Sequence, residues 1–369
     1  MACVAAIAGA SAGRPAGSDG GDEAFAFLRP WVTISRDDIE RVDEGDVLVR
    51  TLPGADGQLA VIGVARLQAP PDRLVAWTRA IADLKRGPFV LAIGRFSDPP
   101  TLADFDALRL DDEDLDAIRT CRPGRCGLKL GMDEIDALQR AVDEEDADWQ
   151  EAIQREFRRV VLQRLDRYRA HGSAGLPPYV DMDEPVHPQE AFDAIMASSP
   201  YLPQHVPDLA ADLEGYPRVQ SPQAESFFYW SKEAFNAGKP VVSVTHVTIA
   251  RPADGAGPPA VIVAGKQIFA SHYMNSSLGL TMVMQGAAPE ARYLVYLNRS
   301  QLDLLGGVFG FLKRSVLEAR IRRDTPRILR GLRDRLESGD PPGASGLVVA
   351  TSTDTRGRSC QAGAASTGG

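Results

Sequence analysis

Hydrophobic spacing changes twice along the chain. Strand-like apolar runs at residues 59–67 and 89–93 flank a helical pattern made by Leu74, Trp77, Ile81 and Leu84. Residues 101–218 then show helical spacing, with a long helix from Trp149 to Tyr168. Strand character returns with a β-branched run at 241–249 and with further predicted strands at 261–273, 278–284 and 293–297. A long amphipathic helix is predicted over 304–337.

The order of these elements predicts an α+β fold. The connections between the later strands are short, so the strands should form a curved antiparallel sheet. The C-terminal helix should cover one face of this sheet, and residues 101–218 should form a helical insertion. Where sheet and helix do not close fully, an apolar cavity is expected between them. Pro326 lies within the last helix and predicts a kink or break near residues 322–325.

The two ends differ in composition from the rest. Residues 2–12 are an apolar, Ala-rich run that ends in Ala10-Ser11-Ala12, a pattern typical of a signal-peptide cleavage site, although no Lys or Arg precedes it. We therefore expect export, to the periplasm for example, with a cytoplasmic location as the alternative. The divisions expected from the sequence are a leader and linker (1–23), the first part of the sheet domain (24–100), an acidic helical insertion (101–218), the remaining strands with the C-terminal helix (219–338), and a disordered tail (339–369).

Two of the four cysteines lie in the predicted folded part. Pro123 and Gly124 stand between Cys121 and Cys126, and suit the central positions of a type II turn. Such a turn brings the cysteines together, which favours a structural disulfide and, with it, an oxidising compartment. Two free thiols or a redox-active dithiol are the alternatives.

The first strand and helix resemble a known family. The strand 59–67 runs into Ala69-Pro70-Pro71 and a helix, which is similar to the opening of START-like, helix-grip proteins. The later strands and the C-terminal helix match the order of that superfamily, so the resemblance covers 47–98 and 225–337. It implies binding of a hydrophobic small molecule or lipid, and some members are cyclases or other enzymes. The insertion departs from the family pattern.

Composition and charge exclude several classes of function. Apolar residues make up 44% and charged residues 25% of the 369 residues, as in an ordinary globular protein. The net charge of −9 argues against binding nucleic acid through its phosphates. We find no nucleophile elbow, zinc-protease, phosphate-loop or dinucleotide motif, and therefore expect no cofactor and favour a non-catalytic role.

Polar residues of the later strands are the candidate ligand-binding residues. Lys266 and His272 are an even number of residues apart, so an extended strand places them on one side. If that side faces the cavity, Lys266 needs a polar companion, and Tyr229, Tyr296 and Asn298 on neighbouring strands are the candidates. The expected ligand-binding set is Lys266, His272, His246, Tyr229, Tyr296 and Asn298. In the competing register, Gln267, Phe269, Ser271 and Tyr273 turn inward and Lys266 lies in water.

Three hypotheses for function follow. The leading one is binding or carriage of a hydrophobic small molecule or lipid between the sheet and the C-terminal helix. The second is an enzyme of the same fold, a cyclase or hydrolase that uses His246 or His272. The third is a protein-interaction module that acts through the insertion.

Two charged segments could take part in binding. The acidic loop with Asp181, Asp183, Glu184 and His187 has metal-capable side chains, but a solvated loop is the better interpretation, so no metal site is expected. Residues 313–337 carry nine Lys or Arg against four Asp or Glu. Peripheral contact with an anionic membrane is one interpretation of this helix. The other is that its basic residues simply cover its solvent side.

Overall fold

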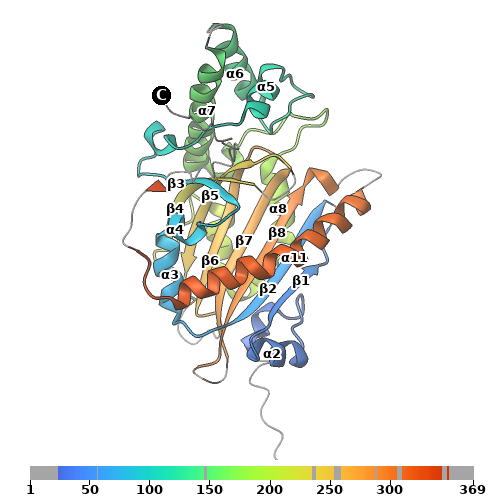
Figure 1. The fold of residues 1–369 in the computed structure, drawn as a ribbon, viewed down its shortest axis with the longest axis vertical. Coiled ribbons are helices and arrows are strands. Elements are labelled where there is room, and N and C mark those ends of the chain that lie inside the picture. The colour runs from blue at the N-terminus through green and yellow to red at the C-terminus, as the bar shows by residue number, and fades with distance from the viewer. Residues whose placement is uncertain are drawn as a thin grey trace, which may run out of the picture.

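A curved, open antiparallel sheet is the centre of the computed structural model (Figure 1). The structure describes residues 24–342, except 56, 145–147, 235–237, 253–258, 287, 289 and 306–309, together with 347–348. The sheet order is β1-β2-β8-β7-β6-β5-β4-β3-β9. The strands are β1 (Val47–Leu52), β2 (Gln58–Leu67), β3 (Val90–Arg95), β4 (Glu225–Glu233), β5 (Val241–Ala250), β6 (Val261–Ala270), β7 (Met274–Gln285), β8 (Arg292–Leu302) and β9 (Leu347–Val348).

One face of the sheet is covered by α3 (Pro71–Arg79), α4 (Ile81–Lys85) and the long α11 (Gly310–Glu337), and we call it the α11 face (Figure 1). Leu329 and Leu336 of α11 are buried in one cluster with Trp77 of α3 and Leu294 of β8. A methyl group added to Gly63 of β2 would approach a Leu329 methyl to 3.0 Å, so the missing side chain of Gly63 lets α11 pack closely.

The opposite face, which we call the insertion face, is also covered by helices. Its core joins sheet residues such as Leu280 and Val295 to α8 (Pro188–Ala197), α9 (Tyr201–His205) and α10 (Pro207–Gly215). Two N-terminal elements, η1 (Ala26–Leu28) and α2 (Arg36–Asp43), complete this layer. The sheet is therefore the middle layer of three.

The remaining helices of the insertion pack at one end of the sheet (Figure 1). They are η2 (Leu102–Phe105), α5 (Asp112–Arg119), α6 (Met132–Glu144), α7 (Trp149–His171) and η3 (Gly172–Gly175). Arg164 of α7 and Glu134 of α6 form a buried ion pair of 2.5 Å, and Phe157 of α7 packs against Phe269 of β6. The insertion thus shares its core with the sheet.

The predicted fold class is confirmed: an antiparallel curved sheet carries a long C-terminal helix and a helical insertion. The break predicted near residues 322–325 is wrong, because α11 continues from Gly310 to Glu337 with Pro326 inside it. Proline removes one backbone hydrogen bond, and packing of the following turns against the sheet holds the helix together. The predicted strand 261–273 ends at Ala270. The leader (1–23) and almost all of the tail lie outside the described residues.

None of the helices in the described part of the chain is long and apolar enough to cross a membrane.

Candidate functional site

The six predicted ligand-binding residues do not form one site. His246 of β5 and Lys266 of β6 pair directly across the strands and point to the insertion face. Tyr229, Tyr296 and Asn298 point to the α11 face instead. The prediction that these three are companions of Lys266 is therefore wrong. Side chains of successive residues alternate between the two faces of a strand. The register of neighbouring strands decides which side chains come into contact, and the sequence does not show the register.

A row of polar side chains crosses the α11 face. Strand pairing links Tyr229, Thr245, Gln267, Ser277 and Ser300, one residue from each of β4 to β8. Asn298 and Tyr296 continue along β8 on the same face. We call these seven residues the sheet patch. On strands that lie at the centre of the sheet, an apolar row would be the ordinary choice.

Hydrogen bonds order one half of the sheet patch. Asn298 donates from Nδ2 to Ser277 Oγ at 3.0 Å. Ser300 Oγ donates to Asn298 Oδ1 at 2.8 Å, and the Ser277 and Ser300 hydroxyls are 2.8 Å apart. These contacts fix the direction of the Asn298 amide.

A charged pair lies at the other end of the sheet patch. Lys85 of α4 donates to Glu233 Oε1 at 2.6 Å and to Tyr229 Oη at 3.2 Å. Burial alone would lower the pKa of Lys85, but Glu233 and Tyr229 raise it above its usual value. Burial alone would raise the pKa of Glu233, but Lys85 lowers it. Lys85 and Glu233 are therefore both ionised, and their opposite charges cancel.

Curvature brings the two ends of the sheet patch toward each other. Three strands separate Tyr296 from Tyr229, yet Tyr296 interacts electrostatically with Lys85, Glu233 and Tyr229. Burial raises the pKa of the Tyr296 phenol to about 12, and Glu233 adds to this effect. Tyr296 is therefore a neutral hydrogen-bonding group at physiological pH.

Gln267 lies in the middle of the polar row. It is 8% exposed, and its Nε2 has no hydrogen-bond partner among the described residues. A buried amide without a partner is costly, at about 1–3 kcal/mol. Its position on the same strand face as Gly265 and Val263 directs it to the α11 face.

The α11 face is incompletely covered next to this amide. Gly265 of β6, Gly279 of β7 and Asn298 of β8 are half-buried although their strands are central. A methyl group added at Gly279 would lie in ordinary van der Waals contact with the Asn298 amide, at 3.6 Å, so this position admits a side chain without a clash. Half-buried Leu84, Val263 and Leu332 supply an apolar border in the same cluster as Tyr296. Hydrogen-bonding groups and an apolar border thus lie together.

Lys266 is buried on the insertion face, which excludes the register that placed it in water. It is 2% exposed, and its Nζ donates to Ser173 Oγ and to the Leu213 carbonyl, both at 2.7 Å. The ammonium also lies 3.7 Å from the centroid of the Phe192 ring. Burial lowers the pKa of Lys266 to about 7. These contacts satisfy the group without a ligand.

His246 is enclosed by aromatic rings. Its Nδ1 is 3.1 Å from the Tyr168 hydroxyl, and Phe228 stacks on it at 4.5 Å. Burial, with Lys266 nearby, lowers the pKa of His246 to about 3, so the ring is neutral. The depression that His246 lines has a volume of about 20 Å³, room for roughly one water molecule. A histidine beside a hydroxyl fits an enzyme, but a substrate does not fit this depression.

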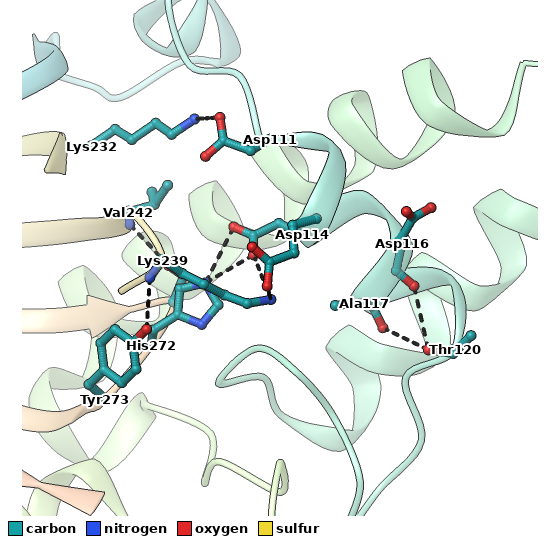
Figure 2. A network of polar contacts seen from close by, with 12 residues as sticks. Asp111, Asp114, Asp116, Ala117, Thr120, Lys232, Lys239, Val242, His272 and Tyr273 are labelled. Atoms are coloured by element: carbon teal, nitrogen blue, oxygen red, sulfur yellow. Dashed lines mark hydrogen bonds and ion pairs between the residues drawn. The ribbon is translucent and has the colours of Figure 1, made fainter. Parts of the chain in front are cut away.

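His272 lies beyond the end of β6, in the turn to β7, where strand alternation no longer applies. Its Nε2 is 3.1 Å from Oδ1 of the buried Asp114 on α5 (Figure 2). Lys239 also points at Asp114, at 3.6 Å, and its backbone N–H donates to the Tyr273 hydroxyl (Figure 2). This network joins the insertion to two strand connections, so its geometry serves docking of the insertion.

Cys121 and Cys126 form the predicted disulfide, with their Cα atoms 4.4 Å apart. The turn between them has Gly124 at a φ of +78°, and Arg125 N–H donates to the Arg122 carbonyl, as expected for the predicted turn.

In the acidic loop, Asp181 forms an ion pair with the buried Lys129, at 3.5 Å. Within the described residues, no cluster of His, Cys, Asp and Glu could hold a metal ion.

The sheet patch contains residues that the sequence analysis did not select. Thr245, Ser277 and Ser300 belong to it, and the Lys85–Glu233 pair borders it. Gln267 entered only through the competing register. The sequence shows polar residues on each of these five strands. It does not show that they line up in one row, because this depends on the strand registers and on a bulge at Ile268.

Comparison with known proteins gives no family for the chain. No protein-family model and no curated protein matches it. The START-like resemblance therefore stays a prediction.

Proposed function

We propose that this protein binds a small amphipathic molecule on the sheet patch, between α4 and α11, and that it does so without catalysing a reaction. The observation that carries the proposal is the buried amide nitrogen of Gln267, which has no hydrogen-bond partner among the described residues and lies in a polar row on central strands. A ligand oxygen that accepts from Gln267 Nε2 would remove the cost of this amide.

The lining of the sheet patch favours a neutral ligand with hydroxyl or carbonyl groups. Gln267, Asn298 and Tyr296 offer amide and phenol groups, and the Lys85–Glu233 pair has no net charge to attract an ion. The apolar border of Leu84, Val263 and Leu332 suits a hydrocarbon or ring body. Compared with the hydrophobic ligand expected from the sequence, the proposed ligand needs more polar groups.

The arrangement of elements supports the START-like resemblance, and the resemblance remains part of this proposal. A long C-terminal helix lies across one face of a curved antiparallel sheet, as in helix-grip proteins (Figure 1). Export is also part of the proposal, because a disulfide at Cys121–Cys126 persists best in an oxidising compartment. Peptide mapping without reductant tests export: free thiols at both positions, in protein taken from its native compartment, would refute it.

Thermal unfolding with fractionated extracts tests the binding proposal. Solvent extracts of the source cells are separated by polarity and added to the purified protein. Fractions of intermediate polarity should raise the Tm of the wild type. They should also raise that of Lys266→Met, whose change lies on the other face, but not that of Tyr296→Phe combined with Gln267→Met. Equal stabilisation of all three proteins, or of none, would contradict the proposal.

A further inference from the structure

The outer side of α11 carries a stripe of arginines. Arg320, Arg323, Arg327 and Arg330 follow one another at intervals of three, four and three residues, which places them on one side of a helix. Leu329 and Leu336 are buried on the opposite side, against the sheet. Arg323, Arg327 and Arg330 are exposed, and Arg320 is half-buried. We call these four residues the arginine stripe.

The surroundings of the arginine stripe are positive in an acidic protein. From 313 to 337 there are nine basic and four acidic residues, whereas the whole chain has a net charge of −9. Of the acidic residues, Glu318 pairs with Arg322 at 3.7 Å and Asp324 pairs with Arg323 at 3.0 Å. The Arg323 guanidinium, with Arg327 and Arg320 nearby, holds the pKa of Asp324 below its usual value. The helix therefore presents a positive field to solvent.

Two exposed apolar side chains accompany the arginines. Val316, which is 49% exposed, continues the line of the stripe by one turn, and Ile328, which is 48% exposed, follows Arg327 in the sequence and lies about 100° further round the helix. Guanidinium groups bind phosphate oxygens in a planar, two-pronged manner and are weakly hydrated. Arginines with neighbouring apolar groups suit a surface of anionic headgroups over hydrocarbon better than a purely polar acidic surface.

We propose that the outer side of α11 docks on an anionic lipid bilayer through the arginine stripe. This inference does not rest on the proposed ligand, because the stripe and the sheet patch use different sides of α11. Docking in this manner would bring the α11 face near a membrane, where amphipathic molecules concentrate. In Figure 1, α11 lies at the front of the molecule with its outer side open.

Vesicle cosedimentation of the full chain tests the proposal. Vesicles of phosphatidylcholine with phosphatidylglycerol are compared with pure phosphatidylcholine. One variant replaces all four stripe arginines by glutamine. A matched control replaces four exposed arginines outside α11, Arg125, Arg140, Arg167 and Arg218, by glutamine, so both variants lose the same charge. A third variant changes the four stripe arginines to lysine and keeps the charge.

The wild type, the matched control and the lysine variant should bind the anionic vesicles and not the pure phosphatidylcholine. Replacing the stripe by glutamine should lower binding by about a hundredfold or more, because each basic residue near such a surface contributes about fivefold. Added salt should weaken binding. Equal binding by the two glutamine variants, or binding to both vesicle types, overturns the proposal. Binding to poly-glutamate but not to vesicles overturns it in favour of an acidic protein partner.

Discussion

Gln267 makes a specific prediction about the balance between stability and binding. Replacing it by Met removes a buried amide whose Nε2 has no partner among the described residues, and keeps an unbranched side chain of similar length. The free energy of unfolding of the ligand-free protein should stay the same or rise by about 1–2 kcal/mol. Ligand retention should fall about tenfold, since one hydrogen bond is worth about 1.4 kcal/mol here.

Urea unfolding and ligand retention of Gln267→Met check this prediction together. Ser277→Ala is a suitable comparison, because it removes a hydroxyl whose partners, Asn298 and Ser300, are fixed. It should destabilise the fold. A strongly destabilised Gln267→Met would mean that the amide is satisfied in the folded protein.

Lys266 makes a prediction about pH. Its pKa is about 7 in the folded protein, below the value of about 10.4 in an unfolded chain. Between these values the unfolded chain binds more protons, so Lys266 makes stability rise with pH over this range. In Lys266→Met this contribution should be absent. Between pH 7 and pH 10, the free energy of unfolding of the wild type should therefore rise relative to that of Lys266→Met. Parallel pH profiles would show that Lys266 keeps an ordinary pKa.

The sequence identified polar residues of the later strands as important but not how they are grouped. Tyr229, Tyr296 and Asn298 were selected and do lie together on the α11 face, with Lys266 and His246 on the other side of the sheet. Composition shows that a strand holds polar residues. Which face they occupy depends on register, and that is set by neighbouring strands far away in sequence.

At the scale of elements, a buried ion pair joins α6 and α7 within their shared apolar core. Arg164 is 1% exposed and holds Glu134, which also accepts the Gly131 N–H at 2.6 Å. Arg164→Met should lower the free energy of unfolding by about 3–5 kcal/mol, because it leaves a buried carboxylate uncompensated. Adding Glu134→Met should recover a large part of the loss. Denaturant unfolding measures both, and equal loss in the single and double variants would contradict this role for the pair.

Most elements were predictable because their local signals are strong. A β-branched run gives β5, and a capping box between Ser35 and Asp38 starts α2. The exceptions involve tertiary packing. Pro326 does not end α11. The strand predicted to reach Tyr273 stops at Ala270, and Tyr273 itself adopts a φ of +65° in the turn that follows.

At the scale of the whole molecule, the insertion covers the face of the sheet that lies opposite α11. A sheet covered by one C-terminal helix would leave its other face to solvent, but here α8 to α10 cover that face. Lys266 and His246 therefore became core residues. Element order predicts that a helix lies on the sheet, but it does not say which of the two faces an inserted segment covers. This is why a site on one face was predicted with residues from both.

Native mass spectrometry of the gently purified protein tests the central claim most directly. The wild type and Lys266→Met should each carry the same adduct, with the mass of a small neutral molecule. The double variant with Tyr296→Phe and Gln267→Met should be mostly free of it. The account is contradicted if the wild type carries no adduct, if the double variant keeps it fully, or if Lys266→Met, whose change lies across the sheet, loses it to the same extent.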